Sequence, residues 1–280
     1  MKNAAPTVSI VIPAYNHARF LRDSVESAIG QTYPDLEVVI IDNCSTDDTR
    51  SLALSYESKD GRVRYVRNDT NIGMVRNFNK ALAVASGTYI KLLCADDVLE
   101  RGCIEMSLEE FAKNPAVSLV SCARRLVSEN LALVGTLAYS NRRELVPGRQ
   151  AIARCLFHGN LIGEPSAVMV RKEDVGTGFS DGYRQLVDLE MWFRILEKGD
   201  FAFIPETLCR IREHGRRATF KNMLSLAAAR DEIRIYRDYG HKDYIDISFL
   251  KRQELILRRL SFCVVPPLMA LVGKVVPIRR

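Results

Sequence analysis

The sequence predicts an α/β fold with a mostly parallel central sheet flanked by helices, followed by a helical C-terminal appendage. Short apolar runs rich in β-branched residues alternate with segments whose apolar residues recur at helical spacing. Continuous apolar runs are typical of strands that are buried on both faces, and their alternation with helices favours a parallel sheet. We expect residues 1–215 to form the main domain and residues 216–280 to form the appendage.

Four strands are expected in the first third of the chain, at Val8–Ile12, Val38–Ile41, Val63–Val66 and Thr88–Leu93. Each is a short run dominated by apolar and β-branched residues. The ligands of such sheets bind beyond the carboxyl ends of the strands, so the residues that follow each run are the first candidates for a site.

Helices are expected between these strands. The first covers Ala18–Ile29, and the second follows the second strand with Ser45 or Thr46 as its N-cap. A third helix begins near Met74 and stops at Gly87.

The middle of the chain is less regular. Strands are expected at Val117–Cys122 and Phe201–Ile204, and loops with a hairpin are expected over Ser128–Pro147. A helix is expected from near Leu186 to Gly199.

Composition is that of a soluble globular protein, with 47% hydrophobic and 26% charged residues among 280. The net charge of +6 suits phosphate-bearing substrates or an anionic membrane surface, although a solvated basic helix face explains it equally well. The seven cysteines show no paired spacing, which argues against a zinc or disulfide framework and favours the cytoplasm. Cys94 and Cys122 are interpreted as small buried apolar residues.

No signal peptide is recognised, because a strand-like run begins almost at once. The apolar tail over Phe262–Ile278 contains three prolines and a lysine, so it is better suited to lying on a membrane than to spanning one. We therefore expect a cytoplasmic protein with peripheral contact at the inner face of the cell membrane.

Acidic residues follow two of the predicted strands. Asp96 and Asp97 are adjacent carboxylates, which repel each other unless a cation or hydrogen-bond donors compensate their charge. A hard divalent cation on a diphosphate is one such partner, and a helix-capping turn is the alternative. Asp42 ends the second strand, where it either accepts hydrogen bonds from a nucleotide or forms a turn.

Two further candidates lie near the C-terminal end of the predicted main domain. Asp188 and Glu190 fall at the start of a helix and point to different sides, so one can act as a general base or as a cap. His214 lies close to Arg210 and Arg212 and is either a phosphate or metal contact or a surface histidine.

The first strand is followed by Pro13-Ala14-Tyr15-Asn16 and not by a glycine-rich phosphate loop. This absence argues against a dinucleotide oxidoreductase and a P-loop enzyme. A sugar nucleotidyltransferase is disfavoured for the same reason.

Several blocks of the sequence resemble family 2 glycosyltransferases with the GT-A fold. They are VSIVIPAYNHARFLRDSVESAIGQTYPDLEVVIIDNCSTDDT, NIGMVRNFNKALAVASGTYIKLLCADD, GEPSAVMVRK, DLEMWFRIL and RIREH, which together extend from about Thr7 to Arg217. The resemblance implies an inverting transfer of one sugar, since the Gln-X-X-Arg-Trp motif of processive synthases is absent. It also implies a nucleotide-sugar donor, a divalent metal (Mn²⁺ or Mg²⁺) and a saccharide or lipid-linked saccharide acceptor, with no nucleic acid.

The same resemblance implies roles for individual residues. The nucleotide sugar would be contacted by Pro13, Ala14, Tyr15, Asn16, Asp42, Arg76 and Asp96. Asp96, Asp97 and His214 would hold the metal, and Asp188 would be the general base. The chain departs from the family's Asp-X-Asp motif, which falls on Cys94-Ala95-Asp96, so a non-catalytic nucleotide-sugar-binding protein is the main alternative.

Overall fold

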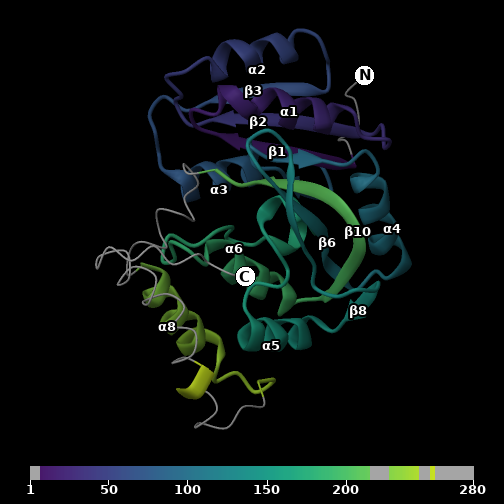
Figure 1. Cartoon of the computed structure of the whole chain (residues 1–280), viewed down its shortest axis with the longest axis vertical. Helices are drawn as coiled ribbons and strands as arrows, with labels where there is room; N and C mark the ends of the chain where they lie inside the picture. The colour runs from purple at the N-terminus through teal and green to yellow at the C-terminus, as the bar shows by residue number, and fades with distance from the viewer. Residues whose placement is uncertain (1–6, 215–226, 246–252, 256–280) are drawn as a thin grey trace.

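The structure is a computed structural model that describes residues 7–214, 227–245 and 253–255. A single sheet of ten strands runs through this part of the chain (Figure 1). The order along its main path is β3 (Val63–Arg67), β2 (Leu36–Asp42), β1 (Val8–Ala14), β4 (Tyr89–Leu92), β9 (Val168–Arg171), β6 (Val117–Val127), β10 (Asp200–Arg212) and β5 (Val98–Leu99).

Strands β3, β2, β1 and β4 pair parallel with one another in that order, and β6 pairs parallel with β10. β9 lies antiparallel between β4 and β6 and so joins the two parallel groups. β5 and β8 (Glu144–Val146) pair antiparallel with β10, and β7 (Leu133–Leu137) pairs antiparallel with β6. The predicted α/β fold with a mostly parallel sheet is confirmed, with the antiparallel pairings concentrated in the second half of the chain.

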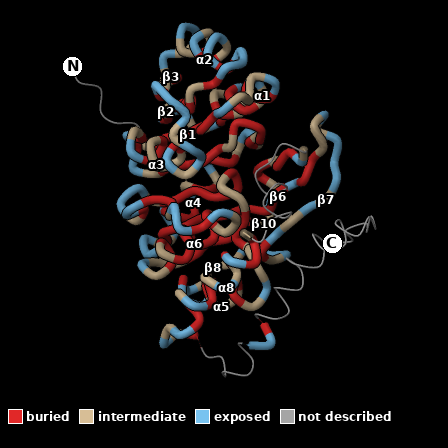
Figure 2. The backbone as a smooth tube through the Cα atoms, turned by 90° about the vertical axis from the view of Figure 1, so that its left-hand side faces the viewer, coloured by how far each residue is buried: buried red, intermediate tan, exposed pale blue. Residues whose placement is uncertain are grey.

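Helices cover both faces of the sheet, as expected for strands that are apolar on both sides. One face packs against α1 (Ala18–Ile29), α2 (Thr49–Glu57) and α4 (Cys103–Lys113). The other packs against α3 (Met74–Val84), α5 (Gly148–His158), α6 (Val187–Leu196) and α8 (Ala227–Tyr239). Figure 2 shows the central strands buried between these layers, whereas β7 is largely exposed.

The predicted start of α2 is wrong by a few residues. The helix begins at Thr49, because Ser45 and Thr46 are held in the preceding loop. The backbone N–H of Ser45 donates to Oδ1 of Asp42, and that of Thr46 donates to Oδ1 of Asn16. These side-chain acceptors compete with helical pairing, as short polar side chains commonly do.

The pattern-based prediction also missed α4, α5 and β9 and shortened β10. β10 extends for 13 residues because it passes through a bulge near Pro205, where the apolar run is interrupted. The region 128–147 contains β7 and β8, but they pair with β6 and β10 and do not form a hairpin with each other.

The described part of the C-terminal region packs against the main body. Ile235, Tyr236 and Tyr239 of α8 are buried in the same apolar cluster as α5 and α6. The predicted boundary between residues 215 and 216 remains a prediction, and the apolar tail over 262–278 lies outside the described residues. Among the described helices, none combines the length and apolar character needed to cross a membrane.

Gly148 is a point where no larger residue fits. A Cβ atom at this position would lie 2.1 Å from the carbonyl oxygens of both Leu196 and Gly199, so α5 approaches the end of α6 backbone to backbone. Gly148→Ala should therefore lower the free energy of unfolding by about 1–3 kcal/mol, the usual cost of overpacking.

Urea denaturation of the variant and the wild type measures this loss. Gly61→Ala is the matched control, because a Cβ atom there would meet no atom within 4 Å. Equal destabilisation by both substitutions would contradict the proposed backbone contact.

Candidate active site

A cavity of about 480 Å³ opens at the carboxyl ends of β1, β2 and β4. Its walls come from the loops after these strands, the start of α3, the turn before β9 and the segment that leads into α6. The position agrees with the rule that ligands bind beyond the carboxyl ends of parallel strands.

The first wall is formed by the end of β1 and the residues after it. Pro13, Ala14 and Tyr15 line the cavity, as does His17. Asn16 has a positive φ of 55° and does not line the cavity. Its side chain accepts the N–H of Thr46, so it fixes the loop that carries its neighbours.

Asp42 is fully buried and lies behind the cavity wall. Its Oδ2 accepts the hydroxyl of Tyr65 at 2.6 Å and lies 3.6 Å from the guanidinium of Arg67, and its Oδ1 accepts the N–H of Ser45. Burial, together with the hydrogen bond to Asp42, raises the pKa of Tyr65 to about 12. The charge of Asp42 is thus compensated within the protein.

Asparagine side chains, and not the predicted nucleotide contact Asp42, line the cavity beyond the end of β2. Asn43, Asn71 and Asn77 line the cavity and belong to one hydrogen-bonded network. Nδ2 of Asn43 donates to Oδ1 of Asn71 at 2.8 Å, and Nδ2 of Asn68 donates to both Asn43 and Asn77 at 2.9 Å. Sequence analysis missed this network, although the closely spaced asparagines from 68 to 77 were a usable signal.

The acid pair after β4 divides into two environments. Asp96 lines the cavity, and its Oδ2 lies 2.8 Å from Nε2 of His214. Asp97 does not line the cavity: its Oδ2 accepts the hydroxyl of Ser166 at 2.6 Å and its Oδ1 accepts the N–H of Arg212 at 2.9 Å. Asp96 and His214, two predicted metal ligands that are 118 residues apart in the sequence, are therefore in direct contact.

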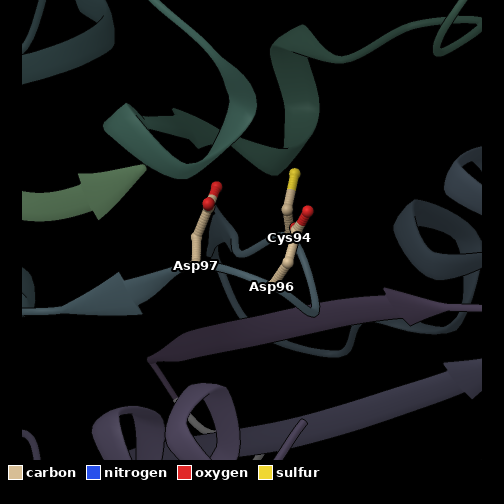
Figure 3. A group of neighbouring side chains, drawn as sticks. All are labelled: Cys94, Asp96 and Asp97. Atoms are coloured by element: carbon tan, nitrogen blue, oxygen red, sulfur yellow. The ribbon is translucent and has the colours of Figure 1, made fainter. Parts of the chain in front are cut away.

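Cys94 lies beside Asp96 and Asp97 (Figure 3). It is only partly buried and lines the cavity, so its interpretation as a buried apolar residue is wrong. One ligand atom from each of Cys94, Asp96 and Asp97 lies within 4.8 Å of the others. Figure 3 shows the three side chains on the same side of the loop. Two carboxylates with an adjacent imidazole suit a divalent cation that accepts oxygen and nitrogen ligands.

Asp188 lies in the first turn of α6 and lines the cavity opposite the first wall. Its Oδ2 accepts Nδ2 of Asn160 at 3.2 Å. Burial, with a smaller contribution from the nearby charge of Glu164, raises the pKa of Asp188 to about 7, against the opposing effects of a backbone N–H and of Arg124. A carboxyl group that titrates near neutrality is suited to accepting a proton.

Glu164 is a third acid in the cavity, after Asp96 and Asp188, and it was not predicted from the sequence although it lies in the GEPSAVMVRK block. Its Oε2 accepts Nε of Arg124 at 2.6 Å, and the Arg124 side chain is only 4% exposed. A Cβ atom at Gly163, which has a φ of 117°, would lie 3.0 Å from this guanidinium. The ion pair holds the charge of Glu164 next to Asp188.

Arg76 lies outside the cavity. Its side chain is 71% exposed and forms an ion pair with Asp181 at 3.7 Å, while its neighbours Val75 and Asn77 do line the cavity. The structure thus brings Pro13, Ala14, Tyr15, Asp96 and Asp188 to one cavity, with Asp97 and His214 directly behind Asp96.

The sequence of this chain is similar to those of known proteins. The profile of a family described as "Glycosyl transferase family 2" matches residues 9–179. Chondroitin synthase from Escherichia coli is 30% identical over 218 residues, which cover 78% of this chain but only 30% of the synthase.

Two solved structures share the fold. TarS residues 1–349 from S. aureus, in complex with UDP-GlcNAc, superposes with a TM-score of 0.71 at 16% identity, covering 96% of this chain and 76% of TarS. The mannosyltransferase PcManGT from Pyrobaculum calidifontis, in complex with GDP-Man and Mn²⁺, superposes with a TM-score of 0.64 at 16% identity, covering 98% and 77%.

Asp188→Asn should stabilise the folded protein at neutral pH. The pKa of Asp188 is raised from 3.8 to about 7 by folding, so the folded state keeps a proton that the unfolded chain loses above about pH 4. The contribution of Asp188 to stability therefore falls between about pH 4 and pH 7, by at most about 1.4 kcal/mol per pH unit, and is constant above that window.

Thermal or urea unfolding at pH 4 and pH 8 measures the effect. The stability difference between Asp188→Asn and the wild type should be larger at pH 8, and an equal difference at both pH values would refute the assigned pKa.

Proposed function

The chain belongs to glycosyl transferase family 2 and is an enzyme with the GT-A fold, and from that membership we propose that it transfers one sugar from a nucleotide-diphosphate sugar to an acceptor hydroxyl, with inversion. The observation that supports this proposal best is that Asp96 and Asp188, from distant segments, line one cavity. One acid that can hold a cation and one acid that can accept a proton, placed in the same cavity, suit the displacement of a diphosphate by a hydroxyl.

The donor would lie along the first wall. Pro13, Ala14, Tyr15 and Asn43 line this side, and the asparagine amides offer hydrogen-bonding groups for a base and a ribose. TarS with UDP-GlcNAc and PcManGT with GDP-Man indicate that this fold accepts nucleotide sugars. We propose a UDP-linked donor for this chain.

Asp96 and His214 would hold a divalent cation, Mn²⁺ or Mg²⁺, with Asp97 directly behind them. Asp97 itself would orient the site, because its two oxygens are tied to Ser166 and Arg212. When bound, the cation would offset the negative charge of the departing diphosphate. PcManGT in complex with Mn²⁺ supports this cofactor.

Asp188 would act as the general base. Its raised pKa keeps it able to take a proton near neutral pH, and Asn160 fixes one of its oxygens. The acceptor oxygen would form its bond to the anomeric carbon as its proton passes to Asp188. The bond between that carbon and the diphosphate oxygen would break in the same step, with the electron pair leaving on the diphosphate.

The acceptor would be a saccharide or a lipid-linked saccharide, in the synthesis of a cell-surface polysaccharide or glycolipid. The similarity to chondroitin synthase supports a saccharide acceptor, although the chain spans about 30% of that protein. We propose that the enzyme works in the cytoplasm at the inner face of the cell membrane, as its basic and apolar C-terminal sequence suggests.

Asp188→Asn should lower sugar transfer by about 10²–10⁴-fold, because the general base is removed while the donor wall is untouched. A screen of UDP- and GDP-sugars with Mn²⁺, scored by release of the nucleoside diphosphate, first identifies the donor. Glu190→Gln is the matched control, since Glu190 lies in the same helical turn, pairs with Arg194 and does not line the cavity.

The control should retain wild-type turnover and the wild-type affinity for the donor. Unchanged turnover in Asp188→Asn would refute the assignment of the base.

Asp96→Ala should abolish donor binding that depends on Mn²⁺. Asp96 faces both the cavity and His214, so its loss removes the central carboxylate of the cation site. Calorimetric titration of the donor, once in the presence of Mn²⁺ and once in the presence of EDTA, separates donor binding that depends on the metal from donor binding that does not. Donor binding by the variant that is still enhanced by Mn²⁺ would count against this role.

A further inference from the structure

The segment just before α6 is held by a residue of α8, which lies 45 to 47 positions further along the chain. The backbone N–H groups of Arg184, Gln185 and Leu186 all donate to Oδ2 of Asp231, at 2.7, 2.6 and 3.1 Å. Asp231 belongs to α8 and is 2% exposed. It therefore supplies an acceptor for the N–H of Leu186, the N-cap residue of α6, and for the N–H groups of the two residues before it.

Two more side chains of α8 contact the same segment. Oδ2 of Asp238 accepts the hydroxyl of Tyr183 at 2.8 Å. Arg234 donates to the carbonyl oxygen of Gly182, and its guanidinium lies over the Tyr183 ring, 4.8 Å from the centroid. Asp231, Arg234 and Asp238 recur at three- and four-residue spacing, so they share one face of α8.

The helix that presents these groups is itself anchored. Ile235 and Tyr236 are buried against α5 and α6, and the hydroxyl of Tyr236 donates to the carbonyl oxygen of Leu156. A carboxylate at the start of α6 is also favoured by the helix dipole. The contact between α8 and the segment is thus rigid and electrostatically favourable.

The held segment forms one wall of the cavity. Arg184, Gln185, Val187 and Asp188 all line it, whereas the proposed donor wall comes from β1 and β2. A base must lie beside the hydroxyl that it deprotonates, so the side chains next to Asp188 face the acceptor. α8 and this wall lie beyond the residues matched by the family profile, which ends at residue 179.

We propose that α8 is part of the active site and that Asp231 is a positioning residue, which fixes the wall formed by residues 184–188 and thereby orients Asp188 toward the acceptor. This inference rests on the proposed function. Loss of Asp231 would free the three N–H groups of residues 184–186, just before α6, and allow the wall to shift. A misplacement of about 1 Å lowers a rate by about 100-fold, so turnover would suffer while the donor wall stays intact.

The test compares Asp231→Ala and Asp231→Asn with the control Asp243→Asn in the full chain. Asp243 is exposed and lies just after the end of α8. Hydrogen exchange at the amides of residues 184–186 reports the hydrogen bonds directly. Steady-state kinetics with the donor and acceptor report kcat and KM separately.

In Asp231→Ala the three amides should exchange faster, and kcat should fall by about 10- to 100-fold at an unchanged donor KM. Asp231→Asn keeps one acceptor oxygen, so it should recover part of the amide protection and part of kcat. Asp243→Asn should match the wild type. Amides that stay protected in Asp231→Ala, or a loss confined to the donor KM, would overturn the proposal.

Tyr183→Phe covers the case in which Asp231→Ala does not fold. It removes only the hydroxyl that Asp238 accepts, so it should lower kcat more mildly at the same donor KM, and wild-type kcat would overturn the proposal. A wild-type protein that transfers no sugar from any donor would refute the proposed function alone, because the exchange measurement still decides whether Asp231 holds the segment.

Discussion

The candidate active site depends on the way in which hydrogen bonds compensate the charge of Asp97. Its two carboxylate oxygens accept a hydroxyl from Ser166 and an N–H from Arg212, residues that are 69 and 115 positions away. Ser166 lies two residues after Glu164, and Arg212 lies two residues before His214. A single buried carboxylate thereby joins the turn after β4, the short 3-10 turn before β9 and the end of β10. Because it is costly to leave a buried carboxylate without its hydrogen-bond donors, this junction keeps the cavity in one arrangement.

The order of strands and helices in the first third of the chain could be predicted, because strands buried on both faces leave uninterrupted apolar runs. The different environments of the acidic residues could not be predicted. Asp42 ends a strand and Asp96 and Asp97 follow one, yet Asp42 and Asp97 accept hydrogen bonds from distant segments and, of the three, only Asp96 lines the cavity. The order of residue types along the chain does not indicate which hydrogen-bond donors these carboxylates meet in the folded protein.

The same reasoning explains which cavity residues were overlooked. Glu164 and Asn71 lie in loops, where no periodic pattern indicates which way a side chain points. Asp188 was identified from its family block, but its raised pKa results from burial and from the charge of Glu164, which are properties of the assembled fold. The sequence was thus sufficient to identify Asp188 as a candidate base, whereas its pKa could be derived only from the folded structure.

The packing of α8 bears on how the protein can be dissected. Ile235, Tyr236 and Tyr239 cover apolar surface of α5 and α6, so a fragment trimmed at the predicted boundary after residue 215 would leave that surface in water. Exposed patches of this kind promote self-association. A shortened catalytic fragment, attractive for crystallisation or for fusion to other modules, would therefore tend to precipitate, and a soluble version must retain the helix.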